Sequence, residues 1–292
     1  MSVRIKSIKT PLFSGLYPIF TPVKNTPLHT ELKKSLGQHF LHDKNMLQKI
    51  SSAIGDLSRF HTVVEVGPGM GALTEWEVQK GHPRYIAVEI DRRWAEHLRT
   101  TFSPNQLTVL NADFLKTDLS PLLENPSIVL GNFPYNISSQ ILFHVLRYAD
   151  RVEEIFGMFQ KEVGIRIAAP PGSKDYGVIS VLLQARYDVT YLFDVPPGCF
   201  SPPPKVMSGI IRLKRKSTPV DYDAELFRRI VKTVFQQRRK TLRNGLKVLL
   251  SESTAPNSFT EDEHFNRRPE QLSLEDFIHL TRQLQPYLKP VP

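Results

Sequence analysis

The stretch Thr62-Val63-Val64-Glu65-Val66-Gly67-Pro68-Gly69-Met70-Gly71 decides the fold of this chain. Its first half predicts a strand, its glycines predict a turn, and residues 72–80 predict a helix that Gly81 ends. This order suits a nucleotide-type cofactor, because glycines let the backbone approach a ligand and the helix start offers free N–H groups. A glycine motif alone is weak evidence, so the segments that follow decide what it means.

Two of the next three predicted strands lead to acidic residues. Residues 85–89 predict a strand that ends in Glu89, and residues 107–110 predict one that Asp113 follows closely. Glu89 is placed to accept hydrogen bonds from ribose hydroxyls, and Asp113 from an exocyclic amine such as that of adenine. A nicotinamide dehydrogenase would share the glycine turn and Glu89, but it would not explain an acid such as Asp113 after the third strand together with Asn132-Phe133-Pro134-Tyr135 after the fourth. In a doubly wound sheet these strand ends share the carboxyl edge, where ligands bind.

The strand predicted at residues 128–130 leads into Asn132-Phe133-Pro134-Tyr135. Pro134 restricts the backbone of Phe133, Asn132 offers an amide carbonyl, and Tyr135 offers a flat face for stacking. Together they suit a nucleobase amine that is presented outside a helix. The alternative for these four residues alone is an ordinary proline-containing turn that begins with Asn132.

Composition limits the remaining possibilities. The 292 residues suffice for one large and one small domain, and a net charge of +9 favours a polyanionic partner or a membrane surface. Cys199 is the one cysteine, which excludes an intramolecular disulfide and a thiolate metal cluster and fits a reducing compartment. No apolar run approaches the roughly 20 residues that span a bilayer. We therefore expect no metal and no membrane segment in a cytoplasmic protein, and we take a monomer as the default.

Two aromatic positions have competing interpretations. Residues 196–205 contain too much proline for a helix or a strand, and Phe200 within them is either a second stacking face for a flipped base or a buried anchor. His39 has no second histidine or acid at ligand spacing beside it. We therefore expect it to pack or to contact backbone, and not to bind a metal or act as a base.

The last quarter of the chain predicts helices with a basic surface. Eight basic residues and no acid lie within residues 228–247. If this stretch is one helix, four of them fall within roughly 60° of one another at 3.6 residues per turn; they are Arg228, Lys232, Arg239 and Arg243. A solvated face usually mixes acids with bases, so we interpret this stripe as a phosphate-binding surface.

The combination of strand ends resembles the ribosomal RNA adenine dimethyltransferase family, a group of class I S-adenosylmethionine-dependent methyltransferases. The resemblance covers residues 33–280 and rests on six segments, which are Ser35-Leu36-Gly37-Gln38-His39-Phe40-Leu41, Glu65-Val66-Gly67-Pro68-Gly69, Gly131-Asn132-Phe133-Pro134-Tyr135-Asn136-Ile137-Ser138, Gln160-Lys161-Glu162-Val163, Phe200-Ser201-Pro202-Pro203-Pro204-Lys205-Val206 and Gln237-Arg238-Arg239-Lys240-Thr241-Leu242-Arg243-Asn244. Two features depart from the family pattern. His39 stands where asparagine is common, and the arm before Glu31 is longer than usual.

The resemblance implies a site and a reaction. The cofactor would be S-adenosylmethionine, held by His39, Leu41, Gly67, Glu89 and Asp113, with Asn132 between it and the target base. The catalytic residues would be Asn132, Phe133, Pro134 and Tyr135. The substrate would be two adjacent adenosines near the 3′ end of small-subunit ribosomal RNA, within an assembling small subunit. Each would become N6,N6-dimethyladenosine.

We accordingly expect an α/β fold with a Rossmann-like, doubly wound, mostly parallel sheet and a small C-terminal all-helical domain. The expected division is a disordered basic arm at residues 1–30, a methyltransferase domain at 31–214 and a helical RNA-binding domain at 219–292. Two alternatives remain at this point. One is a DNA adenine N6-methyltransferase, and the other is a non-enzymatic nucleic-acid-binding factor on the same fold.

Overall fold

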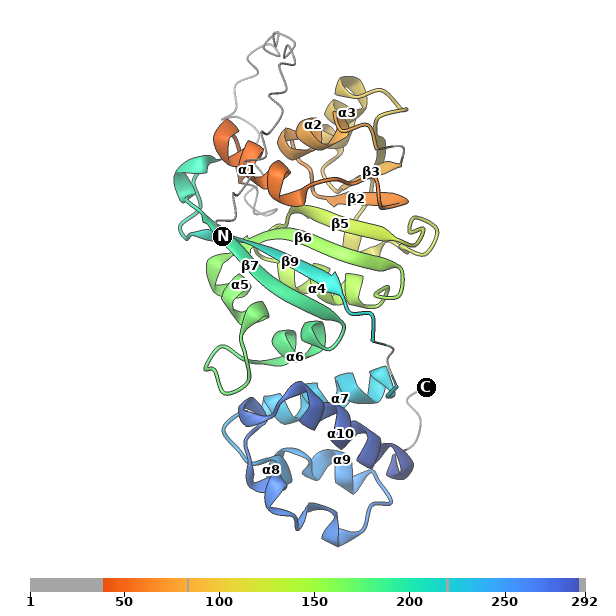
Figure 1. The fold of residues 1–292 in the computed structure, drawn as a ribbon, viewed down its shortest axis with the longest axis vertical. Coiled ribbons are helices and arrows are strands. Elements are labelled where there is room, and N and C mark those ends of the chain that lie inside the picture. Colours follow the sequence, from red (N-terminus) through yellow and green to blue (C-terminus); the bar gives the residue numbers. More distant parts are fainter. Residues whose placement is uncertain (1–38, 83, 219–220, 289–292) are drawn as a thin grey trace, which may run out of the picture.

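The computed structural model describes residues 39–82, 84–218 and 221–288, and the predicted basic arm lies outside them. A seven-stranded sheet with the order β4-β3-β2-β5-β6-β9-β7 forms its centre (Figure 1). The five strands from β4 to β6 in this order are parallel, and β9 runs antiparallel to both of its neighbours. The mostly parallel sheet is therefore confirmed.

The four strands predicted above are found at the expected positions and differ mainly in length. The bounds of the seven strands of the sheet are Thr62–Val66 (β2), Tyr85–Glu89 (β3), Thr108–Asn111 (β4), Ser127–Asn132 (β5), Val152–Gln160 (β6), Tyr187–Val195 (β7) and Ser208–Arg215 (β9). Every residue of β2 and β3 is buried. Strands buried on both faces are typical of parallel sheets that helices cover on each side.

Helices of the described chain cover both faces of the sheet. One face packs against α1 (Lys44–Ile54), α2 (Ala72–Val78) and α3 (Arg92–Thr101). The other packs against α4 (Ser138–Leu146), α5 (Lys161–Ala168) and α6 (Val178–Gln184). Successive residues of β2 alternate between the two cores, with Val63 in the first and Val64 in the second. This arrangement is the predicted doubly wound fold, although the sequence patterns did not predict α3 or α5.

The proline-rich segment is more regular than predicted. It contains a 3-10 turn, Pro197–Cys199 (η3), and a two-residue strand, Phe200–Ser201 (β8). Strand β8 pairs antiparallel with Phe40–Leu41 (β1), and the backbone N–H of His42 donates to the carbonyl of Cys199. The expectation of neither helix nor strand was therefore wrong, because the chain just after His39 supplies a pairing partner that only the tertiary fold brings near.

The C-terminal helices pack on α6 at the end of the molecule opposite α2 and α3 (Figure 1). Their bounds are Ala224–Gln236 (α7), Leu242–Gly245 (α8), Lys247–Ser251 (α9) and Leu274–Leu284 (α10). Short 3-10 turns join them, at Asn257–Thr260, Glu263–Asn266 and Pro269–Gln271, and a last one follows at Gln285–Tyr287. Their apolar side chains form a third core with residues of α6, including Val181 and Leu182.

Residues 228–247 do not form one continuous helix, so the condition for a single basic stripe is not met. Helix α7 ends at Gln236, and α8 begins at Leu242. The physical reason is that Leu242, Leu246 and Leu249 are all buried in the same core as α7, so the chain must turn back on itself. Gly245 permits this close approach, because a Cβ there would lie 3.3 Å from the Cα of Val234.

The described residues provide neither a membrane helix nor a metal cluster. None of their helices is long and apolar enough to cross a membrane. Among the same residues, no three histidine, cysteine, aspartate or glutamate side chains group in a way that could hold a metal ion. Cys199 is buried at the start of the β8 segment, and burial raises the pKa of its thiol.

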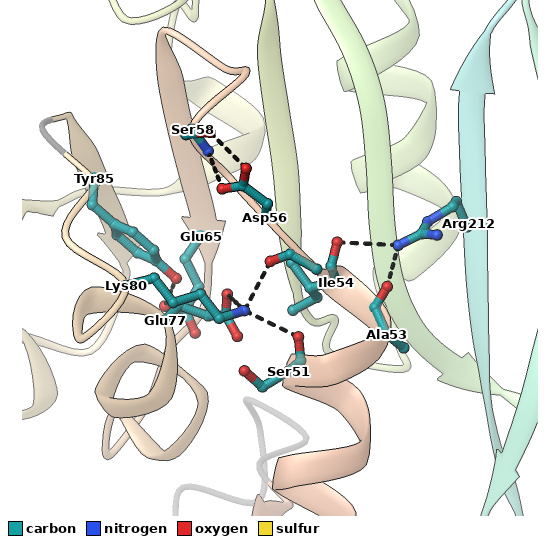
Figure 2. Close-up of polar contacts among 11 residues, drawn as sticks. Ser51, Ala53, Ile54, Asp56, Ser58, Glu65, Glu77, Lys80, Tyr85 and Arg212 are labelled. Atoms are coloured by element: carbon teal, nitrogen blue, oxygen red, sulfur yellow. Dashed lines mark hydrogen bonds and ion pairs between the residues drawn. The ribbon is translucent and has the colours of Figure 1, made fainter. Parts of the chain in front are cut away.

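Buried polar contacts surround Glu65, near the end of β2, and Figure 2 shows its contact with Tyr85. The side chain of Glu65, only 1% exposed, accepts hydrogen bonds from the hydroxyls of Thr74 at 2.7 Å and Tyr85 at 2.8 Å. Burial raises the pKa of Glu65 to about 7, although both hydroxyls oppose the shift. Because burial penalises the charged form more than two hydroxyls compensate, ionisation of Glu65 is costly in the folded protein.

A second set of polar contacts holds the end of α1. The ammonium of Lys80 donates to the backbone carbonyls of Ser51 and Gly55, each at 3.0 Å, and pairs with the buried Glu77 at 2.7 Å (Figure 2). Arg212, on β9, donates to the carbonyls of Ala53 and Ile54. A cation beside the last carbonyls of a helix satisfies acceptors that the helix itself leaves open. Helix α1 is thereby fixed relative to α2 and the sheet.

We expect Glu65→Gln to change how stability depends on pH. The pKa of Glu65 is raised in the folded state, so the wild type loses stability as pH rises from about 4.5, the unfolded value, to about 7. The loss reaches as much as roughly 3 kcal/mol in the free energy of unfolding. Glutamine cannot ionise, so the variant should lack this loss. Urea denaturation at pH 5 and pH 8 measures it, and parallel pH profiles for the two proteins would contradict the assignment.

Candidate functional site

The carboxyl edge of the parallel strands borders a cavity of about 990 Å³. Its walls include Gly67 after β2, Glu89 at the end of β3, Asp113 after β4 and Asn132 at the end of β5. His39 and Leu41 close the cavity from the β1 side. Within the described part of the chain, the structure thus brings all six predicted cofactor-binding residues to one cavity. The size and concave shape are those of small-molecule sites.

The glycine turn and Glu89 form one unit. Gly67, Gly69 and Gly71 all have positive φ angles, and a Cβ on Gly69 would lie 2.8 Å from the ring of Phe40. The backbone N–H of Gly69 donates to Oε2 of Glu89 at 2.9 Å, and that of Asp91 donates to Oε1 at 2.8 Å. Glu89 is therefore held rigidly at the cavity wall.

Glu89 keeps acceptor capacity for a ligand. A carboxylate oxygen has two lone-pair directions, so each oxygen that accepts one backbone N–H can accept a second donor. Burial raises the pKa of Glu89, while the two backbone donors lower it and partly offset the cost of the buried charge. A ligand that offers two hydroxyl donors would supply further compensation of the same kind.

Asp113 lies where the chain leaves β4. Its Oδ1 accepts the backbone N–H of Leu115 at 3.0 Å and so caps the short 3-10 helix Phe114–Lys116 (η2). Its Oδ2 lies 3.7 Å from the ammonium of Lys116, an exposed side chain. This geometry fixes the direction of the carboxylate while leaving it able to accept a hydrogen bond from the cavity.

Asn132 has a defined orientation. Its Nδ2 donates to the backbone carbonyl of His39 at 3.0 Å. A carbonyl can only accept, so the amide nitrogen must point towards His39, and Oδ1 is left as the acceptor of the pair. Asn132 lines the cavity, and its carbonyl oxygen is therefore a placed acceptor at the end of β5.

Phe133 and Pro134 support the loop in different ways. The ring of Phe133 is fully buried and packs edge-on against Phe159, with centroids 5.1 Å apart. It rests on Gly157, where a Cβ would lie 2.4 Å from the ring, and the Phe133 N–H donates to the carbonyl of Met158 at 3.3 Å. Phe133 thus offers only its backbone to a ligand. Pro134 lies against Gly67, since a Cβ there would be 3.8 Å from its ring.

Tyr135 contacts residues that the sequence patterns did not predict. Its hydroxyl is hydrogen-bonded to the hydroxyl of Ser208, at the start of β9, and its ring stacks on that of His39 at 5.6 Å between centroids. The Nδ1 of His39 lies 2.9 Å from the carbonyl of Pro202. Pro202 and Ser208 are more than sixty positions along the chain from these partners, and no local pattern links them.

Phe200 is a buried anchor. Its side chain is 2% exposed and lies in the core that α1, α2 and α3 share with the sheet. The interpretation of Phe200 as a second stacking face is therefore contradicted, because pairing of β8 with β1 turns the ring inward. Leu41, its partner in that pairing, is buried in the same core and also lines the cavity.

The four basic residues of the predicted stripe do not form one helical face. Arg228 and Lys232 lie on α7, Arg239 lies in the turn after it, and Arg243 lies on α8. Arg228 pairs with Glu225 at 2.5 Å, the Lys232 ammonium lies 6.0 Å from the ring centroid of Phe143, and Arg243 contacts the carbonyl of Glu261. Two other basic residues of 228–247 pair with acids from later segments, Arg229 with Glu252 and Arg238 with Glu270.

The chain matches a known family model. The model described as ribosomal RNA adenine dimethylase covers residues 29–284. Among curated proteins, the "Ribosomal RNA small subunit methyltransferase A" of Parabacteroides distasonis is 46% identical over 258 residues, which are 88% of this chain and 95% of that protein. The protein of the same name from Bacteroides fragilis is 47% identical over 259 residues, covering 88% and 93%.

Solved structures show the same fold. A dimethyladenosine transferase from Plasmodium falciparum superposes with a TM-score of 0.73 at 24% identity, over 86% of this chain and all of that one. The 23S rRNA methyltransferase ErmE superposes with a TM-score of 0.58 at 25% identity, over 84% and 99%. The family model spans nearly all of the described residues. This chain therefore belongs to the ribosomal RNA adenine dimethylase family.

Proposed function

We propose that this protein transfers methyl groups from S-adenosylmethionine to the N6 amines of two adjacent adenosines near the 3′ end of small-subunit ribosomal RNA. The observation that carries this proposal is the oriented Asn132 amide at the wall of the same cavity that holds Gly67, Glu89 and Asp113. Family membership and relatives named small-subunit methyltransferases support the choice of substrate.

The cavity fits the proposed cofactor. Glu89, held by two backbone N–H groups, suits the two hydroxyls of a ribose, and Asp113 suits the exocyclic amine of an adenine. Gly67, whose positive φ keeps side-chain atoms away, leaves room for the methionine end, beside the backbone of His39 and Leu41. When bound, S-adenosylmethionine supplies a methyl group made electrophilic by its positively charged sulfur.

Asn132 and the backbone of Phe133 activate the amine. The lone pair of an adenine amine is delocalised into the ring, which makes the nitrogen a poor nucleophile. If Oδ1 of Asn132 and the Phe133 carbonyl each accept a hydrogen bond from one of its N–H groups, the nitrogen becomes tetrahedral and its lone pair becomes available. Tyr135 stacks on the extruded base and aligns it. Alignment supplies most of the acceleration, and the extra proton passes to water after transfer.

We propose that the helices after residue 219 bind the RNA. The substrate would be RNA that already forms part of an assembling small ribosomal subunit. The exposed side chains of Arg239 and Lys240, in the turn between α7 and α8, form no ion pair with any described residue. Unpaired cations on a surface attract phosphates. The protein would act as a monomer in the cytoplasm.

The decisive test is methyl incorporation from labelled S-adenosylmethionine. Small subunits that lack these methyl groups should accept label, and duplex DNA should not. Label entering duplex DNA instead would favour the DNA adenine methyltransferase alternative. Label entering neither, with RNA still bound, would favour the non-enzymatic factor.

Asn132→Ala should abolish transfer, with turnover reduced by about a hundredfold or more, because removing a placed acceptor misaligns the amine. Binding of RNA should stay close to wild type, since Asn132 lies at the cavity wall and away from the basic helices. Single-turnover assays and filter binding measure the two effects. Wild-type turnover in this variant would remove Asn132 from the mechanism.

Glu89→Gln should weaken cofactor binding about ten- to a hundredfold, because the amide group replaces one charged acceptor with a donor. Calorimetric titration with S-adenosylhomocysteine measures the change. The control is Glu96→Gln, which alters an exposed α3 carboxylate paired with Arg92. Equal affinities for the two variants would mean that Glu89 does not contact the ligand.

The double variant Arg239→Gln with Lys240→Gln should weaken RNA binding most at low salt. The slope of log affinity against log salt should fall by roughly 0.7 to 0.9 for each phosphate that the variant no longer neutralises. The matched control is Arg147→Gln with Lys214→Gln, which removes one exposed arginine and one exposed lysine elsewhere. Equal slopes for the two double variants would exclude this turn from the phosphate-binding surface.

A further inference from the structure

Tyr135 is held at its hydroxyl end by a residue from a distant strand. The hydroxyl of Ser208 is hydrogen-bonded to that of Tyr135, and Ser208 itself is fully buried. Burial raises the pKa of Tyr135, so its phenol keeps its proton at neutral pH and the contact is a bond between two neutral hydroxyls. Ser208 is the first residue of β9 and pairs with Gln160 of β6 and Val195 of β7. The partner of Tyr135 is therefore built into the sheet.

One face of the same ring is covered. The imidazole of His39 stacks on it at a centroid distance of 5.6 Å and an interplanar angle of 28°. The carbonyl of Pro202 can only accept a hydrogen bond, so Nδ1 of His39 carries a proton and donates to it at 2.9 Å. The His39 ring is thus fixed to the segment that follows β8. Its backbone carbonyl meanwhile receives the Asn132 amide.

We propose that Ser208 is a positioning residue for methyl transfer, which fixes the ring of Tyr135 by its hydroxyl while His39 covers one face of that ring. The proposal rests on the proposed function, in which Tyr135 stacks on the target adenine. It implies that the adenine stacks on the face of Tyr135 opposite His39. Ser208 acts only through Tyr135 and does not touch the reacting atoms.

The arrangement ties the two supports of the target base to each other. Asn132, which accepts a hydrogen bond from the adenine amine, is fixed by the carbonyl of His39. Tyr135, which stacks on the adenine ring, is fixed by the imidazole of His39 and by the hydroxyl of Ser208. Rotation of Tyr135 would change the plane of the base relative to Oδ1 of Asn132. Because transfer depends on alignment, a loosened ring should lower turnover more than it lowers binding.

A double-mutant cycle tests the proposal with Ser208→Ala, Tyr135→Phe and the two combined. Each single variant should lower kcat for methyl transfer to undermethylated small subunits by about tenfold, the order of one neutral hydrogen bond. The KM for S-adenosylmethionine should change by less than about threefold. The combined variant should match the single variants, because both changes remove the same hydroxyl pair. Effects that multiply to about a hundredfold would overturn the proposal.

Ser127→Ala is the matched control. Ser127 is also a fully buried serine at the start of a strand of the same sheet, and its hydroxyl donates to the carbonyl of Glu124. Loss of either hydroxyl should lower the melting temperature to a similar extent, but only Ser208→Ala should lower kcat. Equal kcat values for the two variants would reduce Ser208 to a structural role.

A second readout does not depend on turnover. In protein labelled with ¹³C-tyrosine, the ring signal of Tyr135 is identified by its absence in Tyr135→Phe, and its linewidth reports motion of the ring. Ser208→Ala should change that linewidth, while Ser127→Ala should not. An unchanged Tyr135 signal overturns the inference even if the wild type methylates RNA. A changed signal in a protein that transfers no methyl group would support the fixing of the ring by Ser208 and refute the proposed function.

Discussion

The hydrogen bond from Nδ2 of Asn132 to the carbonyl of His39 is the constraint on which the site depends. An amide side chain has one acceptor and one donor end, and only this bond decides which end faces the cavity. It joins the end of β5 to the residue just before β1, so the loop after β5 and the cavity wall at His39 share one anchor. The chemistry we propose needs an acceptor at this point, and the orientation supplies it.

The order of the strands explains why that anchor is available. Strand β5 lies next to β2, so Gly67 and Asn132 leave neighbouring strands at the same edge, and Pro134 packs over Gly67. Antiparallel β9 then brings Ser208 back to this edge beside β6, within reach of Tyr135. A purely parallel sheet would place the start of its last strand at the far edge, away from the loop.

Two buried carboxyl groups near the glycine turn, those of Glu65 and Glu89, lower the stability of the folded protein when they ionise. Glu65 and Glu89 are both buried, and burial raises the pKa of each. Hydroxyls satisfy Glu65, and backbone N–H groups satisfy Glu89, so neither carboxyl lies in a purely apolar environment. For Glu89, a bound ligand could reduce this cost further. A bound ribose would supply donors to Glu89 that the free protein lacks.

The sequence by itself determined the doubly wound sheet and the placement of Gly67, Glu89, Asp113 and Asn132 at one edge, because strand, turn and helix signals are local and parallel strands share their carboxyl ends. Only the tertiary structure decided that Phe200 faces inward, that the basic stretch breaks after Gln236, and that Ser208 meets Tyr135. Each of these depends on a partner far along the chain, such as β1 for Phe200 or the core behind Leu242 for the break. Periodicity records which residues are apolar, but it does not record which distant surface buries them.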